Sequence, residues 1–395
     1  MDDDLIDDDG RSLSRKSRLP GAGFFYPDSL DEEYADRRAR EAIEGAEAVV
    51  VADGDADGLA CVALLRERYD AALDVAPFEA SLAARLDPGL DDGDDDDEDE
   101  DTEDSPVGLV TASPHSLSEA LDRVAEYADA GVDVYVCDLC PDDESVVEAA
   151  DAVTDRAATV RWFDHHQWDD DVASAVRAAG VDLVIGESDE ECTADVALRS
   201  LADDFPDHLV DLAAVTRDHD LWIKEDPRSD DLADYAHWAS AEEYVTVVGR
   251  YGPALPEPVV DYLEDRRVEK ERLIEAAVDR AELHDVGPWT VGVTYGRCSQ
   301  NEVAEALRED GADAAVIVKP AGSASIRGSE GFERAHEVAA QVNGGGHPRA
   351  AGCKPDVYDD MLDYAHHWTT EGQATKRVIL AAFERLIEDD GTADE

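Results

Sequence analysis

The chain has 395 residues, which is long enough for two or three domains with hydrophobic cores of their own. Its 98 acidic and 34 basic residues give a formal net charge of −64, the opposite sign to that expected of a protein whose whole surface attracts nucleic acid. The acids are spread over every segment. This favours adaptation to high salt, where the Debye length is about 3 Å at 1 M, over a cationic partner. The charge therefore says little about the substrate.

No apolar run is long enough to span a bilayer, and the N-terminus opens with acids rather than with a secretory signal. The six cysteines are scattered through apolar contexts. We therefore expect a reduced, cytoplasmic protein with no membrane partner. Cys137 and Cys140 form a lone C-x-x-C pair, which favours small buried residues over a zinc or redox site.

Residues 1–45 are predicted to form an irregular, polar N-terminal arm. The arm holds a basic cluster, which is either part of a disordered segment or a contact for a phosphate or a partner. The cluster consists of Arg11, Arg15, Lys16 and Arg18.

Residues 46–225 alternate between short apolar runs and helical patterns. The apolar runs predict buried strands at 46–52, 107–110, 132–136, 160–163 and 181–185. The helical patterns lie at 59–69, 118–130, 144–154, 193–201 and 207–217. Strands that alternate with helices indicate a doubly wound parallel α/β sheet. Residues 88–106 or so are predicted to be a solvated insertion, because the almost purely acidic run from Asp91 to Asp104 cannot bury surface.

Residues 226–285 are predicted to be a helical linker, and residues 286–390 a second, smaller α/β domain. Its strands are expected at 289–293, 314–318 and 324–327, and its helices at 301–308, 332–342 and 375–387.

Acidic residues and histidines follow three of the predicted strands in the first domain. Ligands gather at the carboxyl ends of the strands in an open parallel sheet, so these side chains should meet at one edge. Carboxylates with a minority of imidazoles suit Mn²⁺ or Mg²⁺ better than zinc, and two such ions can activate a phosphodiester. The residues are Asp53, Asp55 and Asp57 after the first strand, Asp138 after the third, and Asp164, His165 and His166 after the fourth. Taken alone, the first group also fits a turn that caps the following helix.

The whole set resembles the DHH phosphoesterase family, which includes RecJ-type exonucleases, nano-RNases and cyclic-dinucleotide phosphodiesterases. The motifs that carry the resemblance are Asp53-Gly54-Asp55-Ala56-Asp57, Asp138, Phe163-Asp164-His165-His166 and Arg217-Asp218-His219-Asp220. The resemblance covers about residues 45–390 and implies a DHH domain followed by a DHHA1 domain, with the active cleft between them. It implies metal ligation by Asp53, Asp55, Asp57, Asp138, His165 and Asp218, and catalytic or supporting roles for Asp164 and His166.

Two positions in these motifs leave alternatives open. Many family members carry His where this chain has Asp53, whereas RecJ-type proteins carry Asp, so Asp53 leans towards the RecJ-like branch. Together with the acidic composition, this suggests a halophilic archaeal type. In the fourth motif Asp218 is preferred as the ligand, and Asp220 is the alternative.

The glycine-rich run Gly344-Gly345-Gly346-His347-Pro348-Arg349 resembles the substrate-binding signature of the DHHA1 domain. Glycine N–H groups can approach a phosphate closely because no Cβ blocks them. The resemblance implies phosphate contacts from Arg327, Gly345, Gly346, His347 and Arg349. The alternative is a tight turn between a helix and a strand.

These observations predict a metal-dependent phosphodiesterase, in the first place a RecJ-like exonuclease acting on single-stranded DNA or RNA. A second hypothesis is an enzyme for very short substrates such as nano-RNA, a cyclic dinucleotide or a nucleoside bisphosphate. A third is a RecJ-like replisome subunit, so replication or repair proteins are expected as partners beside single-stranded nucleic acid or short oligonucleotides.

Overall fold

The computed structural model describes residues 28–86, 105–141, 144–201, 203–357 and 361–393. The basic cluster of the N-terminal arm and the run from Asp91 to Asp104 lie outside these residues. The described chain divides into two compact units, one ending at Glu264 and the other beginning at Asp265. The helix α11 (Glu257–Asp279) runs across the division. No helix in the described part is long and apolar enough to cross a membrane.

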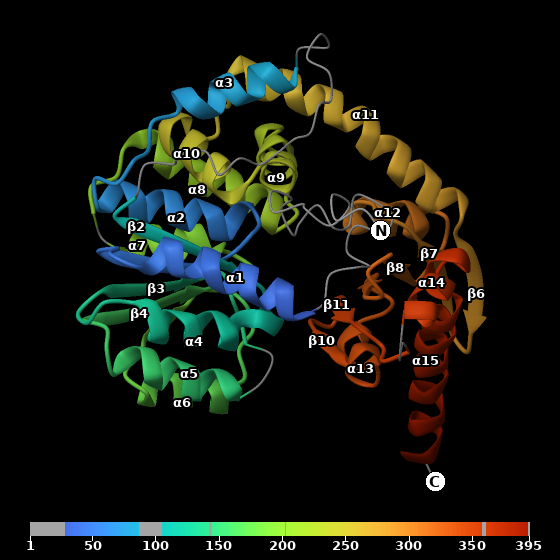
Figure 1. Ribbon diagram of the computed structural model, residues 1–395. Helices are drawn as coiled ribbons and strands as arrows, with labels where there is room; N and C mark the ends of the chain where they lie inside the picture. The colour runs from blue at the N-terminus through green and yellow to red at the C-terminus, as the bar shows by residue number, and fades with distance from the viewer. Residues whose placement is uncertain (1–27, 87–104, 142–143, 202, 358–360, 394–395) are drawn as a thin grey trace, which may run out of the picture. The chain divides into compact units, whose positions relative to one another are not determined.

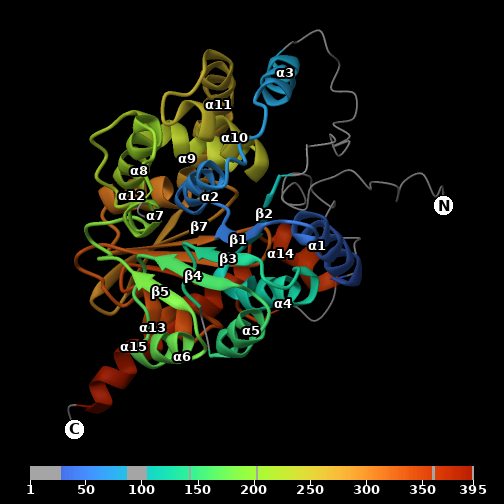
Figure 2. The ribbon, with the colours of Figure 1, turned by 90° about the vertical axis from the view of Figure 1, so that its left-hand side faces the viewer.

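The first unit is built on a parallel sheet of five strands in the order β2-β1-β3-β4-β5. The strands are β1 (Ala48–Asp53), β2 (Val107–Ala112), β3 (Asp133–Cys137), β4 (Thr159–Asp164) and β5 (Asp182–Ile185), which lie side by side in Figure 2. All five match predicted strands, so the doubly wound parallel α/β fold is confirmed. The strand order reverses between β1 and β3, and such a switch point is where ligands bind in this class of sheet.

Alternate side chains of the strands point to opposite faces of the sheet, and each face has its own core. In β1, Val50 and Ala52 join one core, whereas Val49 and Val51 join the other. Figure 1 shows helices on both faces. On one side lie α2 (Ala56–Arg68), α7 (Thr193–Leu201), α8 (Asp207–Asp220), α9 (Arg228–Trp238) and α10 (Ala241–Tyr251). On the other lie α1 (Asp28–Ile43), α4 (Leu117–Tyr127), α5 (Ser145–Thr154) and α6 (Asp170–Ala178).

Three segments of the first unit differ from the sequence prediction. Residues 28–43 form α1 rather than an irregular arm, because Ala39 and Ile43, one helical turn apart, pack into the core. A short helix, α3 (Ala76–Arg85), was not predicted. Helices α9 and α10 fall in the range predicted to be a linker, but Leu232 and Tyr244 are buried in the core of the first unit. The first unit therefore extends to Glu264 rather than to about residue 225.

The second unit contains a six-stranded mixed sheet in the order β10-β11-β9-β8-β7-β6. Its strands are β6 (Glu282–Val286), β7 (Trp289–Tyr295), β8 (Ala314–Val318), β9 (Ala324–Gly328), β10 (Gly344–Gly346) and β11 (Ala350–Cys353). Its other helices are α12 (Gln300–Glu309), α13 (Ala335–Ala340), α14 (Met361–Thr369) and α15 (Gln373–Ala393). Strands β7 and β8 are parallel and joined through α12, whereas the other neighbours are antiparallel. The predicted linker helix gives way to β6, which pairs with β7.

Candidate metal centre

The carboxyl ends of three strands in the first unit place acidic side chains at one edge of the sheet. Asp53 is the last residue of β1, Asp138 follows the last residue of β3, and Asp164 is the last residue of β4. The register pairs β3 with both β1 and β4, so these strand ends are neighbours. The predicted gathering at the switch point therefore occurs.

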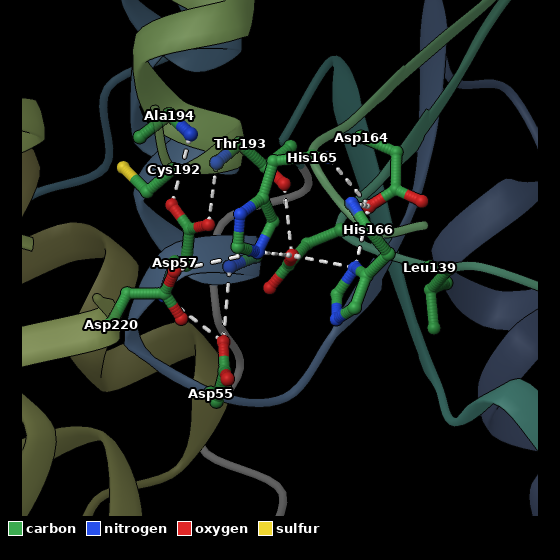
Figure 3. A network of polar contacts seen from close by, with 12 residues as sticks. Asp55, Asp57, Leu139, Asp164, His165, His166, Cys192, Thr193, Ala194 and Asp220 are labelled. Carbon is green, nitrogen blue, oxygen red and sulfur yellow. Dashed lines mark hydrogen bonds and ion pairs between the residues drawn. The ribbon is translucent and has the colours of Figure 1, made fainter. Parts of the chain in front are cut away.

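Two groups of side chains at this edge have ligand atoms within 4.8 Å of one another, and both contain His165. The first group joins His165 to Asp138 and His166, and the second joins it to Asp57 and Asp220. The Nε2 atom of His165 lies 3.8 Å from Oδ1 of Asp138 and 3.3 Å from Oδ2 of Asp220. Figure 3 shows the His165 ring near the side chains of Asp57 and Asp220. His165 is thus shared by two adjoining ligand groups.

Asp138 is held by an unusual backbone conformation as well as by hydrogen bonds. Its φ of 61° lies in the left-handed region, which is costly for a residue with a Cβ and is concentrated at functional sites. Its Oδ1 accepts a hydrogen bond of 2.8 Å from the hydroxyl of Thr193. The same oxygen lies 3.8 Å from Nδ1 of His166. Thr193 was missed in the sequence because nothing in its neighbourhood distinguishes it from the first residue of any helix.

Asp164 is fully buried and organises the loop after β4. Its Oδ1 accepts hydrogen bonds from the backbone N–H of His165 at 2.9 Å and pairs with Nδ1 of His166 at 2.7 Å. Its Oδ2 accepts from the indole of Trp168 at 2.6 Å. Burial would raise the pKa of Asp164, but these bonds and the charge of His166 hold it below its ordinary value. The carboxylate is committed to these partners and fixes the orientation of the following histidine.

The two carboxylates of the loop after β1 have different surroundings. Asp55 caps α2, since its Oδ1 accepts from the N–H groups of Asp57 and Gly58 at 3.0 and 3.1 Å. Asp57 is buried, and its two oxygens accept from the N–H groups of Thr193 and Ala194 at the start of α7, at 2.6 and 2.9 Å. The capping interpretation of this loop is therefore correct for Asp55, and it coexists with a place for Asp57 in the second ligand group.

Asp53 and Gly58 fix the close approach of this loop to the start of α2. The Oδ1 atom of Asp53 accepts from the N–H of Gly54 at 2.6 Å. A Cβ on Gly58 would lie 2.4 Å from the carbonyl oxygen of Asp53, so only glycine fits there. Asp53 is not a member of either ligand group, although its charge interacts with those of Asp55 and His166.

In the fourth motif, the structure places Asp220 rather than Asp218 beside the other candidate ligands. The carboxylate of Asp218 accepts from the N–H groups of Glu225 and Asp226 at 2.9 and 3.2 Å and from the hydroxyl of Ser229 at 2.7 Å, so it closes the loop after α8. Asp220, at the end of the same helix, points into the ligand cluster. Asp218 and Asp220 are two residues apart on a helix and therefore face different directions. The spacing in the sequence did not indicate which of them faces the cluster.

The cluster concentrates negative charge in a poorly solvated place. Burial and the charge of Asp55 raise the pKa of Asp57 to about 7, and burial and the charges of Asp57 and Asp55 raise the pKa of Asp220 to about 8. Burial and the same neighbours raise the pKa of Asp138 well above its ordinary value. Burial and the charge of Asp55 raise that of Asp53 to about 7. Like charges at this spacing require cations or protons to coexist.

The two histidines have opposite proton affinities. Burial and the charge of His166 lower the pKa of His165 to about 4, so its imidazole is neutral, as a metal ligand must be. For His166, burial alone would lower the pKa, but its bond to Asp164 raises it to about 9. Oδ2 of Asp220 is buried and accepts no hydrogen bond from the described residues. These donor types and this unsatisfied oxygen fit a divalent cation bound by oxygen and imidazole ligands.

A cavity of about 230 Å³ adjoins the cluster on the side of α8 and α9. Besides Asp57 and Asp220, it is lined by Thr216, His219 and His237. His237 comes from the segment predicted to be a linker, so its place beside the cluster could not be inferred from the sequence.

The substrate-binding residues predicted for the second unit lie on neighbouring strands. The run Gly344–Gly346 is the edge strand β10 rather than a loop, and a turn from His347 to Ala350 joins it to β11. Gly345 has open space where a Cβ would lie, since no atom is within 4 Å of that position. Gly346 has a φ of 133°, a backbone conformation that favours glycine. Arg327 on β9 stands opposite Ala350, and its Nε donates to Oδ1 of Asn301 at 2.8 Å. Arg349, next to this position, is exposed.

Comparison with known proteins identifies the fold. No protein-family model and no curated protein sequence matches the chain. Among solved structures, the exonuclease RecJ bound to manganese is 15% identical, with a TM-score of 0.50, and the match covers 89% of this chain and 94% of RecJ. An exopolyphosphatase-related protein from Bacteroides fragilis is 12% identical over 88% of this chain and 98% of that one, with a TM-score of 0.36. The likeness to RecJ shows a shared two-part α/β fold.

Proposed function

We propose that this chain hydrolyses phosphodiester bonds with two divalent cations, Mn²⁺ or Mg²⁺, held by its first unit. The observation that carries the proposal is that His165 lies between Asp138 on one side and the carboxylates of Asp57 and Asp220 on the other, with ligand atoms close enough to share cations. Adjoining ion positions suit a two-metal phosphoesterase, in which one ion acts on the attacking oxygen and the other on the leaving oxygen. The shared fold with manganese-bound RecJ supports the same class of chemistry.

Each residue of the centre has a part in this proposal. Asp57, Asp138, His165 and Asp220 hold the ions, and Asp138, within 4 Å of both histidines, is the carboxylate best placed to serve both positions. The ions, when bound, would polarise the phosphodiester and lower the pKa of an attacking water. Asp53 and Asp55 add negative charge beside the ligands.

Asp164 and His166 act as a unit in the same scheme. Asp164 bonds Nδ1 of His166 and keeps the imidazolium charged, because the pKa of His166 is about 9. A charged imidazole held in one orientation can donate to a phosphate oxygen and stabilise the negative charge that develops there. Asp164 is therefore a positioning residue, and His166 is the group that touches the substrate.

We propose single-stranded DNA or RNA as the substrate and exonucleolytic cleavage of the RecJ type. Asp53 in place of the His found in many family members favours this branch. Phosphate contacts would come from Arg327, Gly345, Gly346, His347 and Arg349 of the second unit. Replication or repair proteins are proposed partners of such an enzyme.

The test is a cleavage assay with the purified full chain. End-labelled single-stranded oligomers of 2 to 30 nucleotides, roughly, are incubated with Mn²⁺ in molar KCl, beside the Asp138→Asn variant. Progressive shortening from one end supports the proposal, provided that the variant is inactive. Cleavage confined to the shortest substrates would replace it with the short-substrate hypothesis. If the wild type hydrolysed none of these substrates but bound replication proteins, the third hypothesis, a RecJ-like replisome subunit, would be favoured.

A further inference from the structure

Two cationic side chains follow the parallel strands of the second unit. Strands β7 and β8 end opposite one another at Tyr295 and Val318, and the N–H of Gly296 donates to the carbonyl of Val318 at 3.0 Å. Lys319 directly follows Val318, and Arg297 is two residues beyond Tyr295. They therefore begin at the same edge of the sheet, the one at which ligands bind in α/β folds.

Neither cation has a counter-charge in direct contact. Both side chains are partly buried, and neither makes a hydrogen bond or an ion pair with the described residues. Neighbouring cations of the same unit are paired, as Lys270 is with Glu302 at 2.9 Å and Arg334 with Glu337 at 2.8 Å. In a chain with 98 acidic residues, two partly buried cations without a contacting carboxylate require an explanation.

Burial lowers the pKa values of both cations, and only the charges of Cys298 and Glu269 oppose that effect. Burial and the positive charge of Arg327 both lower the pKa of Lys319. Burial lowers the pKa of Arg297, and the charge of Glu269 opposes that effect. Arg327 lies on the same face of the sheet as Lys319, because Ala315 and Arg327 are register partners and side chains alternate along β8. An anion bound beside Lys319 would offset its burial and the repulsion between its charge and that of Arg327.

The helix α12 begins at the same edge and adds to the attraction. It follows β7, and its N-cap residue, Ser299, makes no side-chain capping bond. Its first turn is tied to β9 by bonds between Gln300 and Ser325 and between Asn301 and Arg327. Free N–H groups and the helix dipole favour an anion at such a position. The acid of this turn, Glu302, is neutralised by Lys270.

We propose that Arg297, Lys319 and the first turn of α12 bind a phosphate group of the substrate that is not the scissile one. This inference rests on the proposed phosphodiester substrate and narrows it. This site would be additional to the phosphate contacts proposed for Arg327. Only a substrate with several phosphates can occupy both, so only such a substrate gains binding free energy from the additional site. The substrate class is therefore an oligonucleotide rather than a dinucleotide.

The first test measures anion binding without catalysis. Inorganic phosphate is titrated calorimetrically into the metal-free full chain at constant ionic strength. The variants are Lys319→Gln and Arg297→Gln, with Arg334→Gln as the control, because it removes the same charge from a cation that is paired with Glu337, an acid outside α12. We expect the first two variants to bind phosphate roughly tenfold more weakly than the wild type, or worse, and the control to bind like the wild type. Equal binding by all four proteins would overturn the proposal.

The second test separates this inference from the proposed function. Kinetics with Mn²⁺ are compared for a dinucleotide and for a single-stranded octamer. Lys319→Gln should raise KM roughly tenfold for the octamer, leave kcat unchanged, and leave the dinucleotide unaffected. An equal effect on both substrates would overturn the extra-phosphate assignment. If the wild type cleaved neither substrate while phosphate binding still depended on Lys319, the proposed function would fail and the anion site would stand.

Discussion

In the first unit, the carboxyl ends of β1, β3 and β4 gather carboxylates around His165, and burial raises the pKa values of Asp57, Asp138 and Asp220. In the second unit, the carboxyl ends of β7 and β8 gather Arg297 and Lys319, and burial lowers their pKa values. The same edge of a parallel sheet thus collects charge of opposite sign in the two units. Each cluster of like charges is unfavourable by itself, so each indicates a ligand of the opposite charge. For the first unit this ligand is a metal cation, and for the second it is phosphate.

The largest effect is expected when a candidate metal ligand of the first unit is removed. Asp138→Ala or His165→Ala should reduce hydrolysis roughly a thousandfold or to background, because either change removes a group that is proposed to serve both ion positions. The measurement is turnover under saturating Mn²⁺, with circular dichroism to verify the fold. Asp138→Ala should also leave the metal-free protein as stable as the wild type or more so, since repulsion is relieved. Near-wild-type turnover would show that the ligands are assigned wrongly.

The two acids at the end of α8 provide a matched pair. Asp220→Asn should reduce turnover roughly a hundredfold and weaken Mn²⁺ binding. Asp218→Asn should instead lower the free energy of unfolding by about 1–3 kcal/mol, because the amide cannot accept all three hydrogen bonds of the loop. Turnover per folded molecule should then stay within a few-fold. The reverse pattern, with Mn²⁺ binding lost only in Asp218→Asn, would restore Asp218 as the ligand.

The phosphate contacts proposed for the second unit are removed by Arg327→Ala or His347→Ala. Each lost charge-assisted hydrogen bond to phosphate should weaken substrate affinity by about 1.5–3 kcal/mol, roughly ten- to a hundredfold. Part of the loss appears in kcat if the contact also positions the scissile phosphate. Steady-state kinetics and Mn²⁺ titration are measured side by side. Loss of Mn²⁺ binding with unchanged substrate affinity would refute the division of labour between the two units.

The smallest expected effect is on the stability of the metal-free protein as a function of pH. The pKa values of Asp57 and Asp220 are raised in the folded state to about 7 and about 8, against about 4 in an unfolded chain. Their contribution to stability is therefore complete below about pH 4 and is lost as the pH rises through 7 to 8. The Tm of the metal-free wild type should fall more between pH 6 and pH 8.5 than that of Asp220→Asn. Parallel curves for the two proteins would contradict the raised pKa values.

The fold and the edge of the centre could be predicted because both follow from local patterns. Short apolar runs predicted the five parallel strands. Acidic residues after three of these strands indicated that their side chains meet at one edge of the sheet. The choice between Asp218 and Asp220 could not be predicted, because it depends on which face of α8 turns towards β4. Thr193 and His237 reach the centre only through tertiary packing of α7 and α9, and their neighbours in the sequence carry no signal of it.

In the proposed centre, His165 and Asp138 lie between two cation positions. This arrangement can be tested by counting Mn²⁺ ions per chain in equilibrium dialysis, in molar KCl so that weak binding to the acidic surface is screened. We predict two tightly bound ions for the wild type and at most one for Asp138→Asn. Fewer than two in the wild type, or two in both proteins, would contradict the account.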